Sequence, residues 1–174
     1  MLDIDGSLMR IVEFQHVKPG KGAAFVRTKL KNVETGQVVD KTFRAGERLE
    51  EAVLEHRKMQ YLYNDGQNYI FMDTENYEQV SVSPAVVGDE AKYLIENQGV
   101  SLFIRKGTPI TMGLPPAVNL KVTGAETWLK GDTSGAATKP VTLETGLVIQ
   151  VPLFVEEGDT IRVDTRSGRY VERV

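Results

Sequence analysis

The chain has 174 residues, of which 41% are hydrophobic and 26% charged, so its composition is that of a folded globular protein and not of a disordered chain. It contains no cysteine, which excludes disulfide frameworks, zinc–thiolate sites and thiol catalysis, and its net charge of −3 argues against indiscriminate nucleic-acid binding. No apolar run approaches the roughly 18 residues of a membrane span and the N-terminus has no hydrophobic signal core, so we expect a cytoplasmic protein that does not bind membranes.

The start of the chain predicts a small curled antiparallel sheet. Two segments with a period of two, residues 8–17 and 23–33, flank a glycine-rich stretch, which is typical of a β-hairpin with a glycine-rich tip. A turn at residues 34–36 leads into a third strand, and we expect the sheet to end near Glu51.

The middle of the chain predicts a meander of strands rich in tyrosine. Turn residues separate the segments MQYLY, NYIFMD and YEQVSV, the first turn lying at residues 64–66, and we expect the tyrosines to build a core. Residues 89–97 place Leu94 and Ile95 at helical spacing behind a capping Asp89, which predicts one short helix. The segment SLFIRKGTPI, which follows, is expected to be another strand.

The last third of the chain predicts a separate barrel. Pro115 and Pro116 force an extended connection that does not fit a sheet, which we interpret as a domain boundary. Five short strand-like segments follow, with a loop rich in Gly, Ser and Thr at residues 131–138 between the first two. Five short strands with such a loop suit an OB-type barrel, a fold that commonly handles oligonucleotides.

One stretch of the chain is locally basic. No acidic residue lies between Glu13 and Glu34, and the two-residue period of a strand places Arg27, Lys29 and Lys31 on one face. Three cations on one strand face could follow a phosphate backbone together. The alternative is a solvated outer face that contacts no partner.

The tip of the predicted hairpin has the sequence Lys18-Pro19-Gly20-Lys21-Gly22. The glycines permit a tight turn and the proline stiffens it, so the turn projects Lys21 into solvent. It is not a nucleotide-binding P-loop, because the spacing G-x-x-x-x-G-K followed by Ser or Thr is absent. On general grounds a lysine in such a turn is a solubilising residue, and a functional role needs a more specific signal.

Several long motifs that follow one another along the chain supply such a signal. In order they are KPGKGAAFVRTKLKN, QYLYNDG, FMDTENYEQ, LKGDTSGAATKP, KPVTLETGLVIQVPLFVEEG and VDTRSGRYVERV. Together they closely resemble the bacterial elongation factor P family, which is homologous to the hypusine-containing translation factor of archaea and eukaryotes. The resemblance runs from about Leu2 to Val174.

This resemblance implies an all-β fold of three small β-barrels in an L-shaped arrangement. An SH3-like (KOW-like) barrel is expected at residues 1–51, an OB barrel with one short helix at 52–113, and a second OB barrel at 114–174. Relatives ordinarily carry another N-terminal strand before the segment matching Leu2 to Gly6, so we expect the first barrel to lack one strand.

The resemblance also implies a function on the 70S ribosome. Members of this family bind between the peptidyl and exit tRNA sites, contact the peptidyl-site tRNA and rRNA, and stimulate peptide-bond formation at consecutive prolines by positioning the peptidyl-tRNA. Lys21 matches the tip residue that a dedicated enzyme modifies in relatives, with Lys18, Pro19, Gly20 and Gly22 around it. On this interpretation the protein is a monomer, is no enzyme, and needs no cofactor or metal.

The same match assigns two further contact regions. Gly131, Asp132 and Thr133 fall on a loop that faces the exit-site codon, and Tyr170 and Arg173 fall near the small ribosomal subunit. From the residues alone, Asp132 and Thr133 could equally cap a turn and Tyr170 could equally pack in a barrel.

Two alternative functions stay open, an elongation factor P-like paralogue with a different ribosomal task and a generic RNA-binding barrel protein. A hydrolase or transferase would need a nucleophile, a base and an orienting group. The chain has only His16 and His56 as imidazoles and no cysteine, and its sequence suggests no triad or metal cluster.

Overall fold

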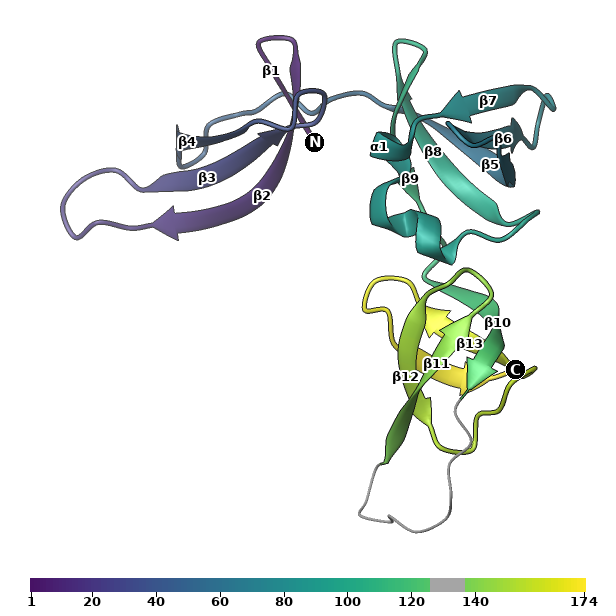
Figure 1. The fold of residues 1–174 in the computed structure, drawn as a ribbon. Helices are drawn as coiled ribbons and strands as arrows, with labels where there is room; N and C mark the ends of the chain where they lie inside the picture. Colours follow the sequence, from purple (N-terminus) through teal and green to yellow (C-terminus); the bar gives the residue numbers. More distant parts are fainter. Residues whose placement is uncertain (126–136) are drawn as a thin grey trace. The chain divides into compact units, whose positions relative to one another are not determined.

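The computed structural model describes residues 1–125 and 137–174, and the chain folds as two compact units (Figure 1). The first unit comprises residues 1–55 and the second residues 56–174. Both are built almost entirely from antiparallel strands, as the all-β prediction requires.

The first unit is a four-stranded antiparallel sheet in the order β1-β2-β3-β4. Its strands are β1 (Leu2–Ile4), β2 (Ser7–Val17), β3 (Phe25–Asn32) and β4 (Val38–Arg44). The predicted hairpin and third strand are thereby confirmed. A small core of Leu2, Met9, Leu30 and Phe43 holds the sheet, and the chain beyond β4 returns to β1, where the Asp3 N–H donates to the Glu50 carbonyl at 2.9 Å.

A β-bulge interrupts the pairing of β2 with β3. Ile11 is opposite Leu30, but the next paired residue of β2 is Glu13, opposite Lys29, so Val12 is the extra residue. A bulge of this kind changes which face of the sheet the following residues occupy. Beyond Val12, Glu13 therefore shares a face with Lys29 instead of pointing toward the core side.

The second unit contains two five-stranded sheets with the same strand order. The first sheet, β7-β6-β5-β8-β9, is made of β5 (Glu55–Asn64), β6 (Tyr69–Asp73), β7 (Gln79–Val82), β8 (Gly99–Arg105) and β9 (Thr108–Gly113). The second, β12-β11-β10-β13-β14, is made of β10 (Ala117–Ala125), β11 (Thr138–Leu143), β12 (Val148–Pro152), β13 (Thr160–Asp164) and β14 (Tyr170–Arg173). In each sheet the first strand in the sequence is central, and the five strands predicted for the last third are all present.

The short helical segment predicted for the middle of the chain is confirmed, but it begins and ends earlier than the predicted residues 89–97. An α-helix, α1 (Pro84–Val87), is followed by the 3₁₀-helix η1 (Gly88–Tyr93). Asp89 lies in the first turn of η1, whose N-cap residue is Val87, and the helix ends before Leu94, which is extended. The apolar spacing that suggested a helix over residues 89–97 reflects burial of Leu94 against the core instead. Neither helix described here is long and apolar enough to cross a membrane.

The tyrosines of the middle segment divide between core and surface, which corrects the prediction that they all build a core. Tyr61 is buried against Phe71, with ring centroids 5.4 Å apart. Tyr63 and Tyr77 are exposed. The register of β5 with β6 shifts between Tyr61 and Tyr63, so the two side chains do not follow the simple two-residue period.

The two sheets of the second unit share apolar packing. Tyr93, from η1, is only 6% exposed because it packs into the core of the second sheet, and Leu114 contacts both cores. Gly168 has φ +68, and a Cβ atom at this position would lie 3.0 Å from the Tyr93 hydroxyl oxygen. The Thr165 hydroxyl donates to the Pro115 carbonyl at 2.6 Å. These contacts fix the two sheets to each other across the proline connection.

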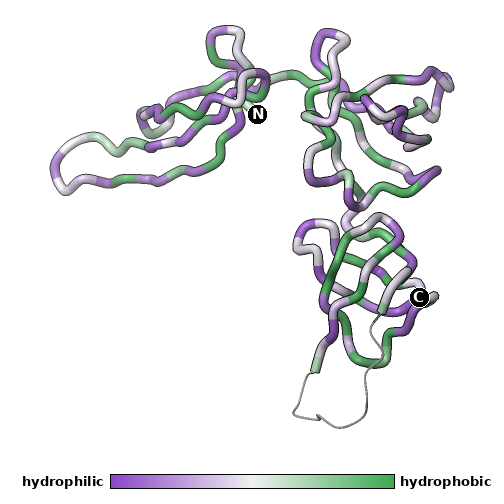
Figure 2. Tube along the Cα trace, viewed as in Figure 1, coloured by the Kyte–Doolittle hydropathy of each residue, from purple (hydrophilic) through white to green (hydrophobic). Residues whose placement is uncertain are grey.

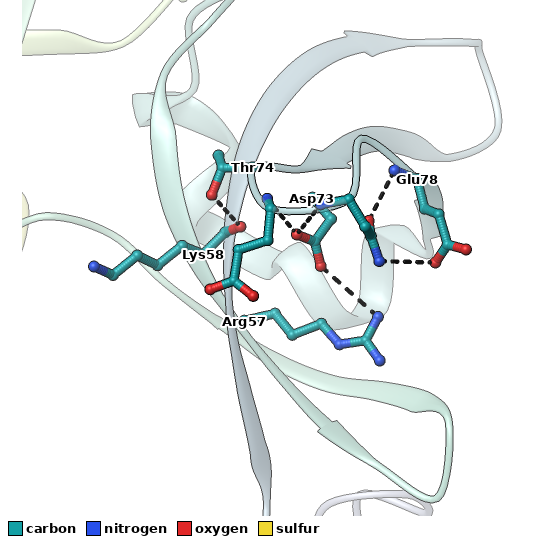
Figure 3. A network of polar contacts seen from close by, with 7 residues as sticks. Arg57, Lys58, Asp73, Thr74 and Glu78 are labelled. Carbon is teal, nitrogen blue, oxygen red and sulfur yellow. Dashed lines mark hydrogen bonds and ion pairs between the residues drawn. The ribbon is translucent and has the colours of Figure 1, made fainter.

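A polar turn between β6 and β7 is held by Asp73 (Figure 3). One carboxylate oxygen accepts from the backbone N–H of Glu75 at 2.8 Å, and the other lies 3.8 Å from the Arg57 guanidinium. Asp73 is buried, so both oxygens need partners. The nearby Thr74 hydroxyl donates to the Lys58 carbonyl at 3.1 Å. We interpret this network as a support for the turn.

Candidate functional site

The tip of the β2–β3 hairpin presents Lys21 to solvent. Strand pairing continues to Val17 and Phe25, and the residues between them form the loop. Lys18 to Gly22 are all exposed, and in Figure 2 hydrophilic positions (purple) alternate with near-white ones in this loop. Gly22 has φ +120, a region that favours glycine, so this residue allows the chain to turn directly after Lys21. The predicted exposure of the tip is confirmed.

Three predicted cations do share one face of β3. Arg27, Lys29 and Lys31 are exposed, whereas Thr28 and Leu30 between them are buried. The alternation follows from the pleat of the strand. Across residues 7–44 the chain has eight Lys or Arg against three Asp or Glu, so this sheet is basic although the whole chain is acidic. The role of these cations as phosphate contacts stays a prediction.

Strand pairing brings carboxylates onto this face that the linear sequence does not place there. Lys29 has Glu13 opposite it on β2 and Asp40 opposite it on β4. The Lys29 Nζ atom lies 3.2 Å from Glu13 Oε2, with both side chains largely exposed. Arg27 instead has the uncharged Gln15 and Thr42 as its cross-strand neighbours. Arg27 and Lys29 are therefore electrostatically different, whereas Lys31 has Arg10 and Val38 as its cross-strand neighbours.

These residues line a shallow hollow of about 400 Å³ in the first unit. We call the face of the sheet that carries Arg27, Lys29 and Lys31 the cationic face. Two cross-strand rows of this face, those of Arg27 and Lys29, supply most of the lining, and the row of Thr28 between them supplies the rest. The lining residues are Glu13, Phe14, Gln15, Arg27, Thr28, Lys29, Asp40, Lys41 and Thr42. The Arg27 guanidinium lies 5.6 Å from the centre of the Phe25 ring, which stabilises its position on the face. The lining includes three cations and two carboxylates, and only the row of Gln15, Arg27 and Thr42 combines a cation, an amide and a hydroxyl, groups that suit an anionic ligand.

The predicted residues near the C-terminus lie in the second unit. Tyr170 is half-buried and packs against the core of the last sheet. The Arg173 guanidinium lies 3.4 Å from Asp159 Oδ2 and 5.4 Å from the centre of the Phe154 ring. Both residues thus have structural contacts within the chain. Gly131, Asp132 and Thr133 lie outside the described residues.

Carboxylates in the turns of the last sheet have lowered pKa values. The backbone N–H of Glu156 donates to Asp159 at 2.9 Å and, with the Arg173 guanidinium, lowers the pKa of Asp159. The backbone N–H and hydroxyl of Ser167 donate to Asp164 at 2.7 and 2.9 Å and lower its pKa in the same way. Stabilisation of the charged form is the physical cause in both turns.

A histidine–serine pair that the sequence did not predict lies on the second unit. His56 Nε2 is 2.9 Å from Ser101 Oγ, and the imidazole stacks on Phe103 with ring centroids 5.1 Å apart. Among the described residues no carboxylate orients this imidazole, and no group of three His, Asp or Glu residues could hold a metal ion. Within residues 1–125 and 137–174 the pair therefore has no third member of the kind that a hydrolytic triad requires.

Nearly all of the chain matches the domains of one protein family. Residues 1–49 match the elongation factor P KOW-like domain, residues 54–112 the elongation factor P OB domain, and residues 118–173 the C-terminal domain of elongation factor P. The relatives include proteins named elongation factor P from Paenarthrobacter aurescens (55% identical over 174 residues), Nocardia farcinica (53% over 174) and Moorella thermoacetica (54% over 172). The matches cover 99 to 100% of this chain and 93% of each relative.

A solved structure shows a related fold. It is described as eukaryotic translation initiation factor 5A from Methanococcus jannaschii, and it matches with a TM-score of 0.51 and 21% sequence identity. The match covers 65% of this chain and 84% of the other. At this level of identity the likeness concerns the fold alone.

Proposed function

The chain belongs to the elongation factor P family of translation factors, and from that premise we propose that it binds the 70S ribosome between the peptidyl and exit tRNA sites. There it stimulates peptide-bond formation at consecutive prolines by positioning the peptidyl-tRNA. The observation that carries this proposal is identity of 53 to 55% with elongation factor P relatives along the whole chain. The basic hairpin with an exposed Lys21 at its tip supports it.

The proposed mechanism is catalysis by orientation. Proline is a poor substrate for peptide-bond formation, so holding the reacting ends in productive geometry raises the rate without any chemical group from the factor. Lys21, with the surrounding Lys18, Pro19, Gly20 and Gly22, extends beyond the last strand pair of the hairpin and can approach the acceptor end of the tRNA. The ribosome performs the reaction, and the factor itself is not an enzyme.

Lys21 is the proposed site of covalent modification by a dedicated enzyme. An exposed lysine in an open loop is accessible to such an enzyme, and an added chain would lengthen its reach. Intact mass of the protein from its own host, compared with the 19.3 kDa of the sequence, tests this point. A mass equal to that of the sequence would remove the proposed adduct.

We propose three modules at residues 1–51, 52–113 and 114–174, in a protein that acts as a cytoplasmic monomer and contacts peptidyl-site tRNA and rRNA. The loop with Gly131, Asp132 and Thr133 is proposed to face the exit-site codon. Tyr170 and Arg173 are proposed to lie near the small subunit, with the Arg173–Asp159 pair supporting the local surface.

The direct test is translation of a reporter that contains consecutive prolines in a purified system. We expect the parent protein to relieve stalling and Lys21→Ala to lose most of this effect. Lys106→Ala, in a turn of the second unit, is the matched control and should behave like the parent. No relief by any variant, including protein modified in its own host, would contradict the proposed function. It would favour a paralogue or a generic RNA-binding protein.

A further inference from the structure

The cations on the cationic face of the first unit have different charged neighbours. The sequence alone predicted only that Arg27, Lys29 and Lys31 lie together on this face. Two neighbouring rows across the sheet differ in charge: Lys29 lies between Glu13 and Asp40, whereas Arg27 lies between Gln15 and Thr42. Phosphates are attracted to a cation only to the extent that nearby carboxylates do not cancel its field. Arg27 and Lys29 should therefore not be equivalent toward an anion.

The bulge in β2 creates this arrangement. In an uninterrupted pairing Val12 would be opposite Lys29, and Glu13 would move to the other face of the sheet. The extra residue instead sets Glu13 opposite Lys29, with Lys29 Nζ 3.2 Å from Glu13 Oε2. Bulges commonly redirect side chains next to functional sites. The same register leaves Gln15, an amide, beside Arg27.

The Arg27 row has the chemistry of a phosphate-binding site. A guanidinium presents several N–H donors in a fixed plane, and the Gln15 amide and Thr42 hydroxyl on either side can add further donors. All three residues line the hollow of about 400 Å³. The Phe25 ring, 5.6 Å from the guanidinium carbon, holds the arginine at this place.

We propose that this hollow binds one phosphate group of an RNA backbone through Arg27, Gln15 and Thr42, and that Glu13 and Asp40 withhold Lys29 from RNA. Lys29 is then a positioning residue, because it holds Glu13 in place. The row of Glu13, Lys29 and Asp40 carries a net negative charge and repels phosphate, so the RNA backbone binds with its phosphate at Arg27 and not at Lys29. This inference rests on the proposed function, because it assumes that the partner is ribosomal RNA or tRNA. It adds to that function which cation binds the phosphate and which does not.

The test is the affinity of single variants of the full chain for ribosomes that carry peptidyl-site tRNA, measured between about 50 and 200 mM KCl. Arg27→Ala should weaken binding on the order of tenfold and reduce the slope of log affinity against log salt by about one. Arg27→Lys should restore the slope because it restores the charge. Lys29→Ala should change affinity by less than about twofold and leave the slope unaltered.

Glu13→Gln is the most discriminating variant, because the inference predicts that it binds ribosomes more tightly than the parent. Removing the carboxylate releases Lys29 to the RNA, so binding should become about two- to fivefold tighter and the salt slope steeper. All substituted side chains are exposed, and thermal unfolding of each variant checks that the fold is retained. If the parent binds ribosomes but Arg27→Ala and Lys29→Ala weaken binding equally, or Glu13→Gln weakens it, the inference is wrong while the proposed function stands. If the parent does not bind ribosomes, the proposed function fails first.

A second measurement identifies the partner as RNA. The parent contains no cysteine, so Val38→Cys, on the exposed face opposite Lys31, can carry the only iron chelate in the protein. Hydroxyl radicals from this position should cut ribosomal RNA or tRNA in the bound complex. Binding without any RNA cleavage would overturn the inference in favour of an acidic protein partner.

Discussion

The outer face of the first unit exposes its charged residues, whereas the contact between the two sheets of the second unit buries an aromatic ring. We call this contact, made by Tyr93, Leu114 and Gly168, the joint. On the hairpin, Arg27, Lys29 and the tip remain exposed above a core of four buried residues. At the joint, the Tyr93 ring is buried between two sheets whose cores share Leu114. The comparison indicates that the hairpin supplies contact with a partner, whereas the joint supplies stiffness. Each region can be altered without the other.

The largest effect is expected from removing the ring at the joint. Tyr93→Ala should lower the free energy of unfolding of the second unit by about 3 to 5 kcal/mol, because a large buried side chain leaves a cavity. It should also separate the unfolding of the two sheets into distinct transitions in calorimetry. Tyr77→Ala, at an exposed site, is the matched control. A single transition at unchanged temperature for Tyr93→Ala would contradict a stiff joint.

A core substitution in the first unit should act locally. Leu30→Ala is expected to destabilise that unit by about 2 to 3 kcal/mol, near the lower end for such changes because its core is small and partly able to collapse. Native-state hydrogen exchange should show faster exchange of β2 and β3 amides, with β10 and β13 unaffected. Equal acceleration in the two units would mean that they unfold as one.

Gly168→Ala tests the close approach at the joint. Its φ of +68 disfavours alanine by about 1 to 2 kcal/mol, and the new Cβ would lie 3.0 Å from the Tyr93 hydroxyl oxygen. Gly146→Ala has a similar φ of +84 with nothing within 4 Å of the new Cβ, so it reports the backbone effect alone. Chemical denaturation should show the larger loss for Gly168→Ala. Equal losses of unfolding free energy in the two variants would show that the Tyr93 side chain moves aside at no cost.

The smallest effect concerns acid stability of the second unit. The pKa values of Asp159 and Asp164 lie below the ordinary 3.8 in the folded protein, so both carboxylates bind protons more readily after unfolding. Their contribution to stability is present above pH 3.8 and is lost as the pH falls through the lowered folded values. Asp164→Asn should reduce the acid-induced fall in melting temperature. An unchanged acid profile would argue against this source of stability.

Local pattern was sufficient to predict strands, turns and the exposed tip. The two-residue period identified β2, β3 and β4, and the paired prolines marked the connection before β10. Helical spacing predicted the helix but extended it beyond Tyr93, because burial of Leu94 in an extended segment produces the same apolar pattern as a helix face. The exposed Tyr63 escaped prediction because a register shift cannot be recognised in one sequence.

The candidate site was predicted only in part for the same reason. The sequence placed Arg27, Lys29 and Lys31 on one face and Lys21 at the tip. It could not show that Glu13 and Asp40 flank Lys29, since cross-strand neighbours depend on registers and on a bulge. Recognition of the electrostatic difference between Arg27 and Lys29 therefore required the structure.

The most direct test of the account is the single-turnover rate of proline–proline bond formation on ribosomes saturated with the factor. At saturation, differences in binding are removed and only the positioning effect of the bound factor is measured. The parent should accelerate the step, Lys21→Ala should bind yet leave the rate near that without factor, and the control Lys106→Ala should accelerate the step as the parent does. An undiminished rate with Lys21→Ala would contradict the central claim that the tip lysine positions the reacting ends.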